Sequence, residues 1–303
     1  MNYYSIALFI LLFVSCNSLN KKSDNINDLP VQANDTILEK TYHTLPDLPD
    51  SISFAGENIL LKGNEDLQDR LYNELVIQIN FHSKTILMLR ELGKWRSILE
   101  TLLEENGVHK DFVFLAMAES GLDNEATSPK GAAGMWQIMT QTAKEKGLVV
   151  DKYVDQRRDP FLATKAACDY LKQSRQTLGS WINAVAAYNR GLNGIKRELD
   201  AQNVDSFLDV YTYKETSRYL FRILAMKIVF NAPEEFGFVL KGDQLKKSFE
   251  FSEKTLAPGE YNAIELAEKF GLNYRTLKLY NPWIRDSRSY RLVLNKEVKI
   301  RFP

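Results

Sequence analysis

The chain has 303 residues, enough for about two domains, and a hydrophobic fraction of 45% that supplies at least one sizeable core and excludes a wholly disordered chain. Lys and Arg number 39 and Asp and Glu also number 39, so the zero net charge argues against a general polyanion binder and we expect no nucleic-acid partner. Two cysteines exclude a disulfide scaffold, and the three histidines lie too far apart for metal-ligand spacing.

The chain begins with an apolar run of the kind found in signal peptides. Residues 6–14, IALFILLFV, are too few to span a bilayer, which takes about 20 residues. The string FVSC that ends at Cys16 resembles a bacterial lipobox, in which the signal is cut before a cysteine that becomes lipid-modified. No Lys or Arg precedes the apolar run, which departs from that pattern. We predict a lipoprotein signal peptide over residues 1–15 and lipidation at Cys16; the alternatives are an uncleaved anchor or a chance hydrophobic run.

Residues 16–50 are rich in Asn, Asp, Ser, Lys and Pro and lack periodicity, which predicts a flexible tether. Beyond the tether the apolar spacing predicts helices up to about residue 235, with hardly any alternating strand signal. Asn64 and the pair Asp159-Pro160 are typical of helix starts. We divide this stretch into two parts, an N-terminal helical segment over 51–107 that packs on a helical domain over 108–238.

The C-terminal stretch has a different pattern. It contains a weakly alternating segment, a Pro-Gly turn, two short helices and a closing strand, at Ser248–Lys254, Pro258-Gly259, Ala263–Phe270, Tyr274–Leu279 and Val298–Phe302. This order predicts a small α+β module over residues 245–303. The expected fold class is therefore mainly α, a helical domain followed by a small α+β module.

One acidic residue lies at the end of an apolar helix. Phe112, Leu115 and Ala116 precede Glu119 by seven, four and three positions, so they share its helical face. Poor solvation and the negative end of the helix dipole both disfavour the carboxylate and raise its pKa. A carboxylic acid that donates a proton near neutral pH needs such a pKa. The alternative is a helix-end glutamate that points to solvent.

The segment after Glu119 supplies groups that suit a sugar ring. Gly131 and Gly134 let the backbone approach a ligand closely. Aromatic and apolar side chains suit the apolar faces of sugars, while amides and hydroxyls suit their hydroxyl or N-acetyl groups. The side chains of these kinds are Ser120, Ser128, Trp136, Gln137 and Met139. We expect them to form a carbohydrate-binding wall beside the carboxyl group.

Four short motifs follow one another along the chain. They read E-S-x-L, S-x-x-G-A-x-G-x-W-Q-x-M, A-Y-N-x-G and E-T-x-x-Y, and begin at Glu119, Ser128, Ala187 and Glu215. In this order, over about residues 108–230, they resemble the lytic transglycosylases of the soluble-transglycosylase type. The C-terminal pattern is similar to a LysM glycan-binding module, although its string EYNAIELA departs from the usual D-T-L-x-x-I-A.

The resemblance implies a lysozyme-like catalytic domain and a role for several side chains. The acid/base glutamate of the family falls on Glu119, and the tyrosine that hydrogen-bonds and orients it falls on Tyr188. Positions that contact substrate or form the pocket fall on Gln137, Met139, Asn189 and Tyr219. The motif glutamate Glu215 is usually structural in the family, so we do not count it as catalytic.

The resemblance also implies the reaction. Most glycosidases use two carboxylates, whereas this family uses one. The glutamate protonates the glycosidic oxygen between N-acetylmuramic acid and N-acetylglucosamine, and then takes the proton of the muramic acid's own 6-hydroxyl, which attacks C1 and closes a 1,6-anhydro ring. No metal or cofactor is needed. Two alternatives stay open, a lysozyme-like hydrolase that uses water and a lipoprotein that only binds peptidoglycan.

The expected location agrees with this reaction. A lipid anchor at Cys16 and a flexible tether would hold the protein at a membrane of the cell envelope, and we expect the outer membrane, on its periplasmic side. The expected partners are peptidoglycan glycan strands and, through the anchor, the membrane. We expect a monomer.

Overall fold

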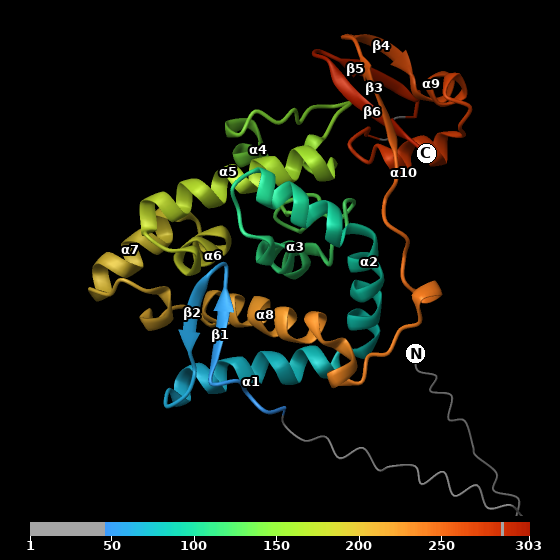
Figure 1. Ribbon diagram of the computed structural model, residues 1–303. Coiled ribbons are helices and arrows are strands. Elements are labelled where there is room, and N and C mark those ends of the chain that lie inside the picture. Colours follow the sequence, from blue (N-terminus) through green and yellow to red (C-terminus); the bar gives the residue numbers. More distant parts are fainter. Residues whose placement is uncertain (1–45, 286–287) are drawn as a thin grey trace, which may run out of the picture. The chain divides into compact units, whose positions relative to one another are not determined.

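The computed structural model describes residues 46–285 and 288–303 (Figure 1). The predicted signal peptide, Cys16 and most of the predicted tether lie outside these residues. Helices dominate the described part, which confirms the mainly α fold class. Within it, no helix is both long and apolar enough to cross a membrane.

The helices are α1 (Glu65–Asn80), α2 (His82–Glu105), α3 (Val113–Ser120), α4 (Thr140–Glu145), α5 (Pro160–Leu178), α6 (Trp181–Arg190), α7 (Leu192–Gln202), α8 (Lys214–Asn231), α9 (Ala263–Lys269) and α10 (Tyr274–Tyr280). The strands are β1 (Ser51–Phe54), β2 (Glu57–Leu60), β3 (Ser252–Leu256), β4 (Gly259–Asn262), β5 (Arg291–Leu294) and β6 (Val298–Phe302). Short 3₁₀ turns are η1 (Lys110–Phe112), η2 (Gln156–Arg158), η3 (Phe207–Asp209), η4 (Pro233–Phe236) and η5 (Gly242–Gln244).

The predicted helix starts are confirmed by their hydrogen bonds. The Asn64 side chain accepts the N–H of Leu67 at 3.1 Å, which begins α1. The Asp159 carboxylate accepts two N–H groups of the first turn of α5, at 2.9 and 3.1 Å. These side chains satisfy amide groups that have no partner inside the helix.

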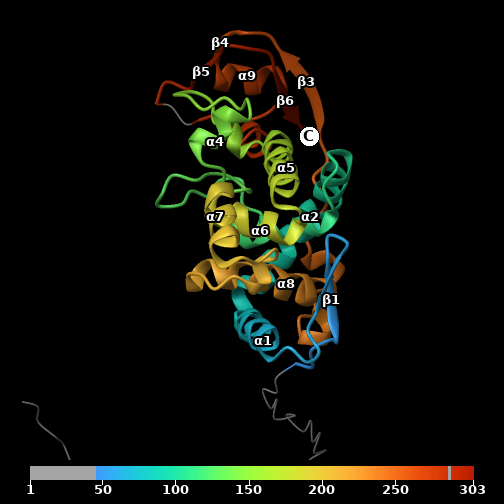
Figure 2. The ribbon, with the colours of Figure 1, turned by 90° about the vertical axis from the view of Figure 1, so that its left-hand side faces the viewer.

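A β-hairpin begins the described chain, where the sequence predicted only helices. Strands β1 and β2 pair antiparallel, and Ala55 and Gly56 connect them with φ of 51° and 82°. Positive φ at both turn residues matches the twist of a hairpin, but alanine rarely takes it, so the turn is hard to predict. Lys227 of α8 donates to the Ser53 carbonyl at 2.6 Å, which places β1 beside α8 (Figure 2).

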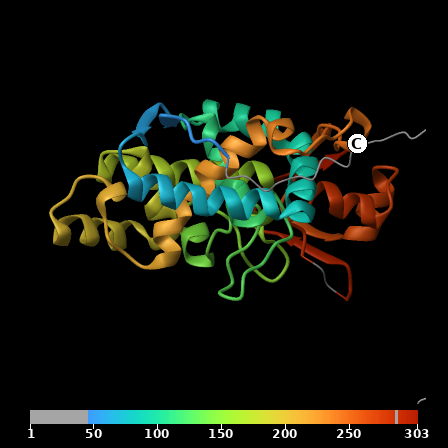
Figure 3. The ribbon, with the colours of Figure 1, turned by 90° about the horizontal axis from the view of Figure 1, so that it is seen from below.

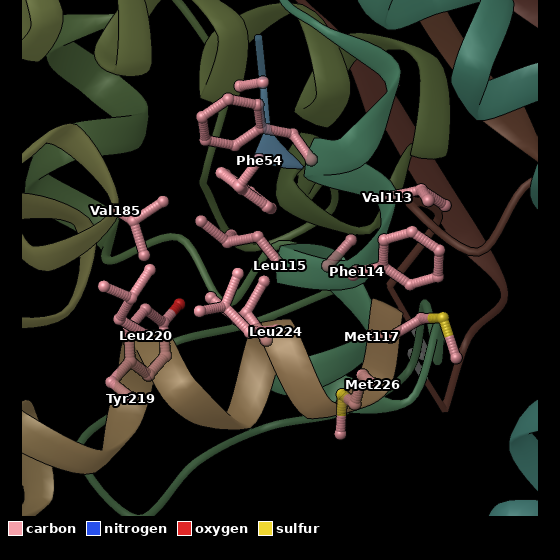
Figure 4. Close-up of a cluster of buried hydrophobic side chains, with 14 of the residues drawn as sticks. Phe54, Val113, Phe114, Leu115, Met117, Val185, Tyr219, Leu220, Leu224 and Met226 are labelled. Atoms are coloured by element: carbon pink, nitrogen blue, oxygen red, sulfur yellow. The ribbon is translucent and has the colours of Figure 1, made fainter. Parts of the chain in front are cut away.

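Helix α3 lies in the middle of the helical part. All its residues from Val113 to Met117 are buried, so it is apolar on every face. Figure 4 shows Leu115 next to Leu224 of α8, one of the contacts that bury it. Helix α1 packs along the other side of α8 (Figures 1 and 3). Helix α8 therefore contacts both α3 and α1.

The C-terminal module has a core of its own. Strand β3 pairs with β6, and β4 pairs with β5, both antiparallel, with α9 and α10 between β4 and β5 in the chain. The sequence predicted strand–helix–helix–strand and missed β4 and β5, because each has only four residues, which is too short for a clear alternating pattern. Leu256, Leu277, Leu292 and Ile300 are among the buried residues of this core.

The segment before α5 joins the two cores, which belong to one compact unit. Val154 is buried in the core of the C-terminal module. Beside it, Asp155 donates its N–H to the Trp283 carbonyl at 2.8 Å. Arg301 of β6 donates to Asp159 at 2.7 Å, and both side chains are almost fully buried. The module is thus held to the helical part by a shared core and a buried ion pair.

We predict that Asp159→Asn lowers stability by about 3 kcal/mol, because it removes the buried counter-ion of Arg301 and leaves only the partly exposed Glu253, which lies 3.6 Å from Arg301 Nε. Asparagine retains an oxygen for the helix cap, so the variant isolates the charge. Urea unfolding measures the change. Asp200→Asn, which removes an exposed pair with Lys196, is the control, at about 0.5 kcal/mol or less. Equal losses in the two variants would contradict the prediction.

Candidate active site

Glu119 lies in the last turn of α3, and its side chain is mostly buried. The helix ends at Gly121, which has a φ of 69° and donates its N–H to the Met117 carbonyl at 2.8 Å. Burial raises the pKa of the Glu119 carboxyl from 4.5 to about 7. At neutral pH this group is therefore present in both its protonated and its ionised form.

Tyr219 of α8 is the hydrogen-bond partner of this carboxyl group. Its hydroxyl donates to Glu119 Oε1, a bond that favours the carboxylate and lowers the pKa of Glu119 against the effect of burial. The Arg222 charge acts in the same direction, whereas the Glu215 charge raises the pKa of Glu119. Burial and the nearby carboxyl raise the pKa of Tyr219 well above 10, so Tyr219 stays a donor.

The structure corrects the expected partner of Tyr188. Its hydroxyl donates to the backbone carbonyl of Trp136 at 2.7 Å, and the bond to Glu119 comes from Tyr219 instead. The Tyr188 ring packs edge-on against Tyr170, with ring centroids 5.6 Å apart, which directs the hydroxyl toward the loop. The Glu119 charge contributes to raising the pKa of Tyr188, so the two side chains are within electrostatic reach of each other.

Trp136 does not form the stacking wall that the sequence predicted. The residue is 0% exposed, and its Nε1–H donates to the Thr164 hydroxyl at 2.8 Å. With its one polar atom bonded inside the protein, the side chain packs in the main core. Sequence reasoning missed this because no local pattern distinguishes a buried tryptophan from an exposed one.

Ser120 and Ser128 use their hydroxyl groups within the loop that follows α3. The Ser120 hydroxyl donates to the Met135 carbonyl at 2.8 Å and accepts the N–H of Asp123 at 3.1 Å. The Ser128 hydroxyl accepts the N–H of Ala132 at 3.0 Å. These bonds fold the loop, so a contact of either serine with a substrate stays a prediction.

Four of the predicted residues line one cavity of about 260 Å³. They are Gln137, Met139, Tyr188 and Asn189. Met139 is 45% exposed and Asn189 is also exposed, so both reach solvent. The lining residues that sequence reasoning missed include Thr142, Tyr170 and Arg190, although Arg190 directly follows the A-Y-N motif. Glu119 and Tyr219 do not line this cavity, but its lining residue Tyr188 is within electrostatic reach of both.

Arginine side chains hold the loop between α3 and α4 in place. Arg157 forms two hydrogen bonds of 2.8 Å with the buried Asp155 and donates to the carbonyls of Gly131 and Ile138, at 2.8 and 3.1 Å. Its neighbour Arg158 donates to the Glu125 carbonyl at 2.5 Å. The loop is thus held by the buried ion pair of Arg157 and Asp155, in which Arg157 also donates hydrogen bonds to loop carbonyls.

Gly134 approaches protein backbone, where the sequence led us to expect a ligand. It has a φ of 79°, and a Cβ at this position would lie 1.9 Å from the Arg157 carbonyl oxygen. Only glycine fits such a contact. Gly131 also has a positive φ, 83°, but a Cβ there would meet nothing within 4 Å.

Other acidic groups near Glu119 in the sequence or on α8 are exposed, whereas the Glu119 carboxyl is mostly buried. Asp123 and Glu125 are exposed loop residues, and Glu215 is exposed in the first turn of α8. Only Glu215 contributes to the pKa of Glu119. Among the residues that the structure describes, no three His, Cys, Asp or Glu side chains gather as a metal site. The arrangement is one buried carboxyl that can both give and accept a proton, beside a cavity.

Comparisons with known proteins match two parts of the chain. Residues 97–207 match the transglycosylase SLT domain, and residues 261–303 match the soluble lytic transglycosylase C-terminal LysM-like domain. Both matches confirm the resemblance inferred from the motifs. Part of the helical region is thus similar to an SLT domain, and most of the C-terminal module is similar to a LysM-like domain. Tyr219 and Arg222 lie outside the matched ranges.

Two curated relatives each match part of the chain. Membrane-bound lytic murein transglycosylase D of Escherichia coli is 25% identical over 190 residues, which are 61% of this chain and 41% of that protein. A putative tributyltin chloride resistance protein of an Alteromonas species is 27% identical over 130 residues, 43% of this chain and 63% of that protein. The chain thus spans less than half the length of the Escherichia coli relative.

Two solved structures are also similar. The 70 kDa soluble lytic transglycosylase of Escherichia coli has a TM-score of 0.42 at 18% identity, over 59% of this chain and 33% of that one. An inactive mutant of the lytic transglycosylase Slt from Pseudomonas aeruginosa has a TM-score of 0.38 at 18% identity, over 56% of this chain and 31% of that one.

We predict that Glu119→Gln changes the pH dependence of stability. The pKa of Glu119 is raised on folding, so its contribution is complete below pH 4.5 and is lost as the pH rises through about 7. From about pH 4 to about pH 8, the parent should lose about 3 kcal/mol relative to the variant, which has no proton to lose. Urea unfolding at both pH values measures this. A constant difference between parent and variant would contradict the prediction.

We predict that Gly134→Ala costs about 3 kcal/mol or more, because a methyl group must displace the Arg157 backbone. Gly131→Ala is the matched control in the same loop. It meets no atoms and carries only the strain of a positive φ, about 1–2 kcal/mol. Thermal unfolding of both variants separates the close approach from the backbone strain. Similar midpoints for the two would show that Gly134 is not in close contact.

Proposed function

We propose that this chain, parts of which are similar to an SLT domain and a LysM-like domain, is a peptidoglycan lytic transglycosylase. It would cleave the β-1,4 bond between N-acetylmuramic acid and N-acetylglucosamine and leave 1,6-anhydromuramic ends. The observation that carries the proposal is the buried carboxyl of Glu119, whose pKa of about 7 suits both the acid and the base role. The name of the Escherichia coli relative, a lytic murein transglycosylase, supports the same substrate.

In the first step, protonated Glu119 gives its proton to the glycosidic oxygen. The bond from C1 of the muramic acid to that oxygen breaks, the N-acetylglucosamine leaves with the proton, and C1 carries positive charge. Glu119 is now a carboxylate, and the hydrogen bond from Tyr219 stabilises this form. Tyr219 is therefore proposed to assist the carboxyl group directly, in addition to the pocket role expected from the sequence.

In the second step, the Glu119 carboxylate removes the proton of the muramic acid 6-hydroxyl. The 6-oxygen attacks C1 and closes the anhydro ring, and Glu119 is protonated again. Each proton that the carboxyl gives is thus returned, and no water is consumed. The substrate supplies the nucleophile, so the reaction needs no second carboxylate and no metal.

The cavity beside Tyr188 is proposed to hold the sugar ring. The amides of Gln137 and Asn189 suit hydroxyl or N-acetyl groups, and the exposed Met139 suits an apolar ring face. Tyr188 itself keeps a supporting role, because its hydroxyl bonds the loop carbonyl of Trp136 next to Gln137. Glycan binding by the LysM-like module over residues 245–303 is part of the same proposal.

We further propose that the protein acts from a membrane of the cell envelope. A signal peptide over residues 1–15, a lipid anchor at Cys16 and a tether over 16–50 would place the catalytic domain, over 108–238, within reach of the wall from the periplasmic face of the outer membrane. Labelling of cells with a fatty-acid analogue, compared with a Cys16→Ala variant, tests the anchor.

Digestion of purified peptidoglycan tests the activity. A form that begins after Cys16 is compared with its Glu119→Gln variant, and mass spectrometry reads the products. We expect anhydromuramic ends from the parent and a loss of about 100- to 10,000-fold in the variant. Products heavier by one water would instead indicate a hydrolase. A folded parent that pellets with the wall without cutting it would indicate a binding lipoprotein.

A further inference from the structure

A buried carboxylate on α1 contacts the helix that carries Tyr219. Glu74 is 2% exposed, and both its oxygens face α8. Arg218 Nε donates to Glu74 Oε1, and Arg222 Nε lies 3.8 Å from Glu74 Oε2. A buried carboxylate needs such cations to compensate for its lost hydration. One acidic residue of α1 therefore determines where two arginines of α8 lie.

Arg222 also lies on the face of α8 that contacts Glu119. Glu215, Tyr219 and Arg222 follow one another at spacings of four and three residues, so they share this face. Tyr219 donates to Glu119 Oε1, which fixes the face against the end of α3. The Arg222 guanidinium thus has two carboxyl groups within its electrostatic reach, Glu74 and Glu119, and its charge lowers the pKa of Glu119.

The arginine forms its ion pair with only one of them. Within the part of the chain that the structure describes, Arg222 pairs with Glu74, and no cation lies within 4 Å of the Glu119 carboxyl. The other groups that face Glu119 are the phenols of Tyr219 and Tyr188, which stay neutral, and Glu215, whose charge favours the protonated form. Arg222 is therefore the one positive charge, among the groups acting on Glu119, that could ionise it by moving closer.

We propose that Glu74 is a positioning residue for Glu119, because it holds Arg222 toward α1 and so keeps an ion pair from forming at the proposed acid. The inference rests on the proposed role of Glu119 as acid and base. It also gives α1 a role beyond packing. Glu74, Arg222 and Tyr219 all lie outside the residues that match the SLT domain, so the protonation of Glu119 depends on both flanks of that domain.

The pH dependence of kcat/KM tests the proposal, with its basic limb reporting loss of the proton from free Glu119. Glu74→Gln removes the buried anion and frees Arg222 to approach Glu119, so the basic limb should move down by about one pH unit. Arg222→Gln removes the cation, so the basic limb should move up. An electrostatic role predicts that the basic limb moves in opposite directions in the two variants. Loss of packing alone would not move it in opposite directions.

Asp111→Asn is the matched control. Asp111 is also a buried carboxylate that pairs with a cation of α8, Lys227 at 2.7 Å, but it is not among the groups that act on Glu119. We expect this variant to lower stability and to leave the basic limb in place. Equal shifts of the basic limb in Glu74→Gln and Asp111→Asn would overturn the proposal. An unmoved basic limb in a folded Arg222→Gln variant would also overturn it. That second measurement still tests the proposal if Glu74→Gln does not fold.

Carbon-13 NMR of labelled glutamate, without substrate, separates this proposal from the proposed function. The Glu119 resonance is assigned by its loss in Glu119→Gln and titrated in the parent and in both variants. Opposite displacements of its titration midpoint would support the positioning role even if the parent cuts no peptidoglycan, in which case only the proposed function fails. A midpoint that is the same in all three proteins would overturn the positioning role whatever the activity.

Discussion

A carboxyl group kept from water at the end of a buried helix is the constraint on which the rest of this structure depends. Helix α3 is apolar on every face, so its last turn can place Glu119 inside the protein. An isolated carboxylate there would be costly, and the group responds by holding its proton to a higher pH. Tyr219 and Arg222 limit this effect and keep the pKa of Glu119 near neutrality. The site is therefore a balance between burial and a few polar contacts.

Buried ion pairs hold the segments around this carboxyl group. The pair of Arg157 and Asp155 carries the loop that lines the cavity, and Arg301 with Asp159 joins the C-terminal module to the start of α5. Such pairs contribute little net stability, because desolvation offsets their attraction, but breaking one of them is costly. In this structure they connect the loop between α3 and α4 to the segment before α5, and the C-terminal module to the start of α5.

The LysM-like module shares its core with the helical part. Val154 belongs to the core of the module, and backbone bonds on both sides of it connect to residues near Trp283. If the module binds glycan as proposed, a flexible linker alone would let it do so independently of the helical part. In this chain, a glycan bound by the module would have a fixed position relative to α5, which limits where the proposed active site can meet the strand.

Much of the fold follows from local patterns in the sequence. The starts of α1 and α5 depend on Asn64 and Asp159, whose partners lie within three residues. The four motifs include four predicted residues that line the cavity, while the role of Glu119 stays a prediction. The hairpin of β1 and β2 was missed because Ala55 takes a positive φ only under tertiary constraint, and β4 and β5 because four-residue strands carry too little pattern.

The sequence alone determined the helical class, the helix starts and the carboxyl group at the end of an apolar helix, because these depend on residues a few positions apart. Tertiary structure decided which tyrosine bonds that carboxyl, since Tyr219 lies 100 residues from Glu119. It also decided that Trp136 is buried and that Gly134 meets the Arg157 backbone. Such contacts depend on how helices that are far apart in the chain pack together, and the spacing of residues within one segment does not predict them.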